Sequence, residues 1–182
     1  MLRVAVLAAV LACVLPAAAV GGPPPNGGVS PTDPAFRPPK KARIRGGLAV
    51  APRGAPRAVR AAIAAGNRIV GKPYRLGGGH ARFEDTAYDC SGAVSYALGG
   101  AGLLASPLAS PDFMRWGSEG AGRWITVFAH EGHAFALIAG LRFDTGLRTA
   151  RARRYGVKPG RGPRWDFPRP TKRFVARHPA GL

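Results

Sequence analysis

Proline and glycine crowd one stretch of this chain, and that crowding limits where a packed core can form. From GGPPPNGG to APRGAP, residues 21–56 hold few large apolar side chains. Such a segment cannot bury enough apolar surface to offset the conformational entropy that it would lose on ordering. We therefore expect residues 20–56 to be a basic linker, and the 182-residue chain to form one packed domain that begins near Pro56.

The first 19 residues, MLRVAVLAAVLACVLPAAA, have the order of a secretory signal: a basic residue, an apolar run and then small residues. We predict that residues 1–19 are a signal peptide, cleaved after Ala19, and that the protein is secreted or associated with the cell envelope. Two alternatives stay open. The uncharged run from Val4 to Val20 is about as long as the shortest membrane-spanning helices. The VLAC tetrapeptide, which ends at Cys13, loosely resembles a lipid-attachment motif.

The formal net charge of +18 is concentrated at the two ends of the chain, while the central segment 58–150 is nearly neutral. For an exported protein, this field favours anionic cell-wall polymers or a membrane surface as partners over nucleic acid. The tail, residues 151–182, is basic and proline-rich, which is typical of disorder. It also contains Trp165, Phe167 and the run RFVAR, so we expect it to dock partly on the domain and to add a strand.

The central segment alternates helical and strand-like patterns. Pro56 and the apolar spacing after it predict a helix over residues 57–70, which Gly71 ends. The loop PYRLGGGH follows, and SGAVSYALGG predicts a second, short helix. The runs 123–129 and 133–145 are strand-like, and the second is expected to turn near Gly140 into two strands.

Cys90 is the one cysteine that remains if the leader is removed, because the chain has only two. It comes just before the second predicted helix, where unpaired N–H groups stabilise a thiolate and can bind an oxyanion. A nucleophilic thiol also needs an imidazole and a polar group that orients the ring. His133 opens a predicted strand and Asp144 ends the returning one, so the two side chains can meet. The alternatives are an intermolecular disulfide and a buried, inert cysteine.

The combination GKPYRLGGG, YDCSG and GHAFALIAGLRFDT resembles the NlpC family of papain-like cell-wall cysteine peptidases over residues 57–145. The resemblance implies an α+β papain-like fold, with the nucleophile at the N-terminus of a helix packed on a small antiparallel sheet. It implies a catalytic domain over residues 57–150 that needs no cofactor or metal, acts as a monomer, and hydrolyses amide bonds in the stem peptides of peptidoglycan.

Residue by residue, the resemblance makes Cys90 the nucleophile, His133 the general base and Asp144 the third member of the triad. It places the Tyr74 hydroxyl near the oxyanion, and Asp89 and Ser91 at the amino end of the substrate.

The chain departs from the family pattern in two places: no PGD turn precedes the histidine strand, and Leu76 stands where tryptophan is common. Two other functions stay open. One is an inactive wall-binding protein that uses its basic ends. The other is a zinc peptidase, built from the HEGH run that ends at His133 or from His80, Asp89 and His133, although HEGH is one residue shorter than the helical zinc motif.

Overall fold

The computed structural model describes residues 40–146, 150–156 and 161–182. The predicted signal peptide, with Cys13, and the first part of the predicted linker lie outside these residues. Within them, six strands form one antiparallel sheet in the order β3-β8-β4-β5-β6-β7. The strands are β3 (Ser118–Glu119), β4 (Ile125–His130), β5 (His133–Ile138), β6 (Leu141–Asp144), β7 (Arg164–Asp166) and β8 (Val175–His178).

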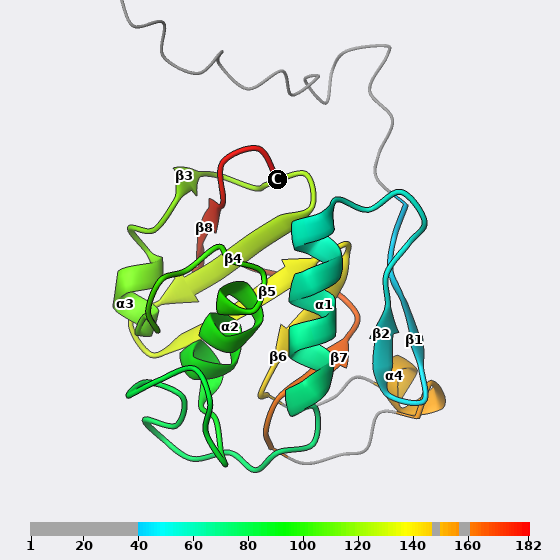
Figure 1. Ribbon diagram of the computed structural model, residues 1–182, viewed down its shortest axis with the longest axis horizontal. Coiled ribbons are helices and arrows are strands. Elements are labelled where there is room, and N and C mark those ends of the chain that lie inside the picture. Colours follow the sequence, from blue (N-terminus) through cyan, green and yellow to red (C-terminus); the bar gives the residue numbers. More distant parts are fainter. Residues whose placement is uncertain (1–39, 147–149, 157–160) are drawn as a thin grey trace, which may run out of the picture.

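Two helices, α1 (Arg57–Ile69) and α2 (Cys90–Gly99), lie across one face of this sheet (Figure 1). The short helices α3 (Ser110–Phe113) and α4 (Ala150–Arg154) lie at its periphery. The predicted α+β class, with a cysteine at the start of a helix that packs on a small antiparallel sheet, is therefore confirmed. None of the helices in the described ranges is long and apolar enough to span a membrane.

Helix α1 begins after Pro56, as the sequence predicts, and buries one face against the sheet. The buried residues are Val59, Ala62, Ile63, Ala65, Gly66 and Ile69. At Gly66 the helix and the sheet approach closely, because a Cβ there would lie 2.8 Å from the Trp165 ring. Helix α2 is buried on all sides from Cys90 to Leu98, since it lies between α1 and β5. The position of Cys90 is thus fixed by core packing.

The prediction of a linker over residues 20–56 is wrong for its final part. Strands β1 (Arg43–Arg45) and β2 (Leu48–Val50) form a hairpin beside α1 (Figure 1). Ile44 and Ala49 are buried, and the Asn67 side chain bonds both backbone groups of Ala49 at 2.9 and 3.0 Å. Few large apolar residues are needed because α1 supplies the other half of this small core.

The hairpin also supports the turn between β5 and β6. Ala139 there has a φ of 47°, which a residue with a Cβ rarely adopts, and Gly140 follows with a φ of 78°. The Ala42 N–H donates to the Ala139 carbonyl oxygen at 2.8 Å, and the Ala139 N–H donates to the Trp124 carbonyl oxygen at 2.7 Å. The first hydrogen bond connects the hairpin segment to the turn between β5 and β6. These two strands carry His133 and Asp144.

The tail contributes two strands to the central sheet. β8 lies between β3 and β4, and β7 forms the edge beside β6. Trp165 on β7 is fully buried and donates its indole N–H to the Asn67 side chain at 2.7 Å. The boundary that we predicted at residue 150 therefore falls inside one sheet, because the core is completed by aromatic side chains from the tail.

Candidate active site

Cys90 occupies the first turn of α2, and Asp89 caps that helix. The backbone of Asp89 is extended, and its Oδ1 accepts a hydrogen bond from the Gly92 N–H at 2.8 Å. Cys90 is 8% exposed and forms no disulfide. The unpaired N–H groups of this turn give its surroundings a partial positive charge, which favours a thiolate.

The glycine loop holds the same carboxylate from the other side. Asp89 Oδ2 accepts from the Gly77 N–H at 2.9 Å, and the Asp89 N–H donates to the Gly78 carbonyl oxygen at 3.2 Å. That carbonyl also lies against Gly92, where a Cβ would overlap it. Glycine is therefore required in both motifs, PYRLGGG and DCSG, because their backbones lie against each other with no room for side chains.

His133 begins β5, and Asp144 ends β6. Their strands pair antiparallel, with Ala136 opposite Phe143, and the ring Nε2 lies 3.0 Å from Asp144 Oδ1. Because Nε2 faces the carboxylate, Nδ1 is the nitrogen left to interact with the Cys90 thiol, which hydrogen bonds this ring. The three predicted catalytic side chains thus form a continuous array from α2 through β5 to β6.

The pKa shifts in this array all favour a thiolate–imidazolium pair. Burial opposes the charged form of His133, but hydrogen bonds to Asp144 and Cys90 outweigh it and raise the His133 pKa to about 9. Burial would raise the pKa of the Cys90 thiol, yet hydrogen bonds from His133 and the Ala134 backbone N–H hold it below its ordinary value. Both shifts therefore favour placing the shared proton on the imidazole.

Asp144 is 1% exposed and is surrounded by donors. Arg142 Nε donates to its Oδ2 at 2.7 Å and Arg169 to the same oxygen at 3.3 Å, while the backbone N–H groups of Thr145 and Gly146 reach Oδ1 at 2.7 and 3.1 Å. Burial alone would raise the Asp144 pKa, but the hydrogen bond with His133 and the charge of Arg142 keep it well below its usual range. Asp144 therefore remains ionised and holds the ring orientation.

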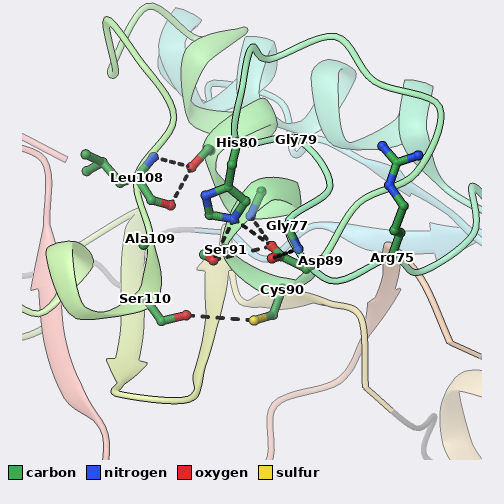
Figure 2. Close-up of polar contacts among 12 residues, drawn as sticks. Arg75, Gly77, Gly79, His80, Asp89, Cys90, Ser91, Leu108, Ala109 and Ser110 are labelled. Carbon is green, nitrogen blue, oxygen red and sulfur yellow. Dashed lines mark hydrogen bonds and ion pairs between the residues drawn. The ribbon is translucent and has the colours of Figure 1, made fainter.

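The three other predicted site residues line one open pocket of about 330 Å³ with Cys90. Tyr74 is 37% exposed there. Asp89 and Ser91 are both buried and joined by a hydrogen bond from the Ser91 hydroxyl at 3.3 Å. His80 Nε2 lies 2.9 Å from Asp89 Oδ1 and 3.2 Å from Ser91 Oγ, as Figure 2 shows. Asp89 thus has a capping function in addition to facing the pocket.

Several residues that support the site were not predicted from the sequence. Ser110, at the start of α3, places its Oγ 3.8 Å from Cys90 Sγ (Figure 2). Arg142 and Arg169 hold Asp144, and His80 holds the cap. Arg142 could have been found, because a charged residue inside the strand-like run LRFD is unusual. Ser110 and Arg169 gave no local signal, since they reach the site only through the fold.

The zinc alternatives gain no support from the geometry. His130 and His133 lie opposite each other at the ends of β4 and β5, so HEGH forms a tight strand connection in place of the helix that the zinc motif requires. In the described part of the chain, no three His, Cys, Asp or Glu side chains gather as metal ligands would.

Fold and site together define an α+β domain with a buried thiol at the N-terminus of a helix that packs on a small antiparallel sheet. Solved structures with a similar fold include the peptidoglycan hydrolase RipB from Mycobacterium tuberculosis, at 23% identity over 70% of this chain and 72% of that chain, with a TM-score of 0.47. The P60 domain of an antigen from M. avium subspecies paratuberculosis has 20% identity over 66% and 93%, with a TM-score of 0.45. A hypothetical invasion protein of M. tuberculosis has 20% identity over 75% and 70%, with a TM-score of 0.46.

Two of these neighbours are thus described as a peptidoglycan hydrolase and as a P60 domain. No family model matches the sequence, and the comparison with curated proteins finds no match.

Proposed function

We propose that this protein is a cysteine endopeptidase that hydrolyses amide bonds in the stem peptides of peptidoglycan. The observation that carries the proposal is the array of Cys90, His133 and Asp144, in which every pKa shift favours a thiolate beside an imidazolium. A merely structural cysteine has no need of a histidine that a buried carboxylate orients. The substrate class comes from the resemblance of the DCSG and PYRLGGG motifs to the NlpC family.

The chemistry follows from the positions of the three side chains. The Cys90 thiolate attacks the amide carbonyl carbon, and a C–S bond forms as the carbonyl oxygen becomes an oxyanion. Backbone N–H groups at the start of α2, with the Tyr74 hydroxyl, stabilise this oxyanion. His133 then gives its proton to the leaving amine as the C–N bond breaks. It next takes a proton from water, which attacks the thioester and releases the acid and the thiol.

The proposal extends to location and assembly. Residues 1–19 would direct export and be removed, so that the enzyme acts as a monomer on the wall outside the membrane. Asp89 and Ser91 would contact the amino end of the stem peptide from the pocket that they line with Cys90. No cofactor or metal takes part in the proposed reaction.

Digestion of purified peptidoglycan tests the proposal directly. Wild-type protein should release muropeptides that mass spectrometry identifies by the bond cut, and Cys90→Ala should release none. Glu119→Gln is the control, because Glu119 is 86% exposed and has no predicted role in the reaction. This variant should release muropeptides as wild type does. Equal release by wild type and Cys90→Ala would overturn the proposal.

Thiol reactivity separates the enzyme from the alternative of an inactive wall-binding protein. Cys90 of an enzyme should react with iodoacetamide well below pH 8, because its pKa is lowered, and His133→Ala should slow that reaction at the same pH. A thiol that titrates near 8.5, with or without His133, would favour the binding protein.

A further inference from the structure

The outer face of the β1–β2 hairpin combines cations with exposed apolar side chains. In the hairpin register Arg43 is opposite Val50 and Arg45 is opposite Leu48, so these four share one face, while Ile44 and Ala49 are buried on the other. Leu48 is 43% exposed and Val50 is 46% exposed. Two partly exposed aliphatic side chains therefore lie beside two arginines on one face of the hairpin.

Two hollows flank this face, and Arg43 and Arg45 line both. The larger, of about 810 Å³, lies between the hairpin and α4 and has buried Ile44 and Leu141 in its lining. The smaller, of about 630 Å³, has Val50 and the segment that follows β2 in its lining. The cationic members of the two linings are Lys40, Lys41, Arg43, Arg45, Arg53, Arg151 and Arg154.

This surface holds positive charge with no compensation among the described residues. Neither hollow has an Asp or Glu in its lining, and no described acidic side chain forms an ion pair with any of the seven cations. Tyr155, 46% exposed, and Phe167 add aromatic rings to the larger hollow, and the Arg151 guanidinium lies 4.3 Å from the Phe167 ring centre. We call the hollows and the face between them the hairpin surface.

The hairpin surface is separate from the candidate active site. The pocket around Cys90 shares no lining residue with either hollow. The hairpin lies beyond α1, on the side away from α2 (Figure 1). A partner bound at the hairpin would therefore leave the pocket open.

We infer that the hairpin surface binds the headgroup region of an anionic phospholipid bilayer. Cations attract anionic headgroups, and aliphatic and aromatic side chains enter the boundary between headgroups and acyl chains. A soluble polyanion would be bound by the cations alone, and it would leave Leu48, Val50 and Tyr155 facing water. The combination of both kinds of side chain on one face favours the bilayer. This inference does not depend on the proposed hydrolase activity.

Vesicle binding by the full chain tests the inference. Sedimentation is measured with vesicles of phosphatidylcholine alone and of equal parts phosphatidylcholine and phosphatidylglycerol. Arg43→Gln/Arg45→Gln should weaken binding to the anionic vesicles about thirtyfold. Each surface cation contributes about 1 kcal/mol, or about fivefold in affinity, and the two contributions multiply. Leu48→Ser/Val50→Ser should weaken it by about tenfold or more. Residues 1–19 are common to all variants, so their contribution cancels.

The matched control is Arg82→Gln/Arg115→Gln, which removes the same charge from exposed positions outside both hollows. It should bind as wild type does, and circular dichroism should show that every variant is folded. The inference is overturned if the control loses as much binding as the Arg43/Arg45 variant, or if wild type binds both kinds of vesicle equally. It is also overturned if Leu48→Ser/Val50→Ser leaves vesicle binding unchanged. In that case, binding of a soluble phosphodiester polymer to the protein would assign the hairpin surface to wall polymers.

Discussion

Replacement of Asp144 by asparagine tests the electrostatic account of the site most directly. The carboxylate is 1% exposed and meets His133 through Oδ1 and Arg142 through Oδ2, at 3.0 and 2.7 Å. An asparagine can offer its oxygen to only one of these donors. If it keeps the ring contact, its amide N–H groups face the Arg142 and Arg169 guanidinium groups, where no acceptor remains.

The size of the effect follows from the His133 pKa. A pKa raised from 6.5 to about 9 corresponds to roughly 3 kcal/mol in favour of the imidazolium, and Asp144 supplies much of it. The Asp144→Asn variant should therefore have a His133 pKa well below that of wild type, and iodoacetamide should alkylate Cys90 at pH 6 at least about tenfold more slowly. The buried Arg142, 7% exposed, loses its partner as well, and we expect a stability loss of about 3 kcal/mol.

The pH dependence of stability gives a second measurement with a definite sign. Because the His133 pKa is raised in the folded state, its contribution is fully present below about pH 6.5 and is lost as the pH rises through about 9. The lowered Asp144 pKa has the opposite sense: its contribution is present above about pH 4 and is lost as the pH falls further. The lowered Cys90 pKa opposes the His133 contribution over the same range, so the slope is measured without the thiol. Urea unfolding from pH 6 to 10 should show the first slope in Cys90→Ala and not in Cys90→Ala/Asp144→Asn.

The assays are histidine titration by NMR, alkylation against pH and urea unfolding, with Glu119→Gln as a charge-matched control. That control removes an acid 86% exposed and should match wild type in all three. An Asp144→Asn variant that is folded and still alkylates with the wild-type pH profile would refute the assignment of Asp144 as the orienting group.

Two further predictions concern the surroundings of the thiol. Gly92→Ala should lower the free energy of unfolding by about 2 kcal/mol or more, because its Cβ would overlap the Gly78 carbonyl oxygen. Gly132→Ala is the control and should lower it far less, since no atom lies nearer than 3.7 Å to its Cβ. Similar urea midpoints for the two variants would contradict the close approach of Gly92 to Gly78. Ser110→Ala should raise the pKa of Cys90 by less than His133→Ala does, because the hydrogen bond with His133 lowers that pKa more than the one with Ser110. An unchanged alkylation profile would show that the 3.8 Å contact has no electrostatic effect.

The local elements could be predicted because short-range rules dominate them. Pro56 begins α1, and the glycine near position 140 turns β5 into β6. Each of these depends on the conformational preference of one residue and its immediate neighbours. The spacing between His133 and Asp144 was equally informative, because an antiparallel hairpin brings its two ends together.

The extent of the fold could not be predicted in this way. Ile44 and Ala49 are small contributions to a core, and in the sequence they lie in a stretch crowded with proline and glycine. Their burial depends on a complementary face of α1 and on the Asn67 side chain, which also accepts from Trp165 in the tail. Composition describes one segment at a time, so it does not show that residues far along the chain provide a surface on which the segment packs.

The sequence by itself determined the thiol, its helix and its two partners, because these follow from residue type, helix capping and strand pairing. Only the tertiary structure decided that Asp144 is held by two arginines, that Ser110 faces Cys90, and that the β1–β2 hairpin belongs to the domain. These features join residues that are distant in sequence, and the free energy that brings them together comes from a core to which no single segment contributes enough on its own.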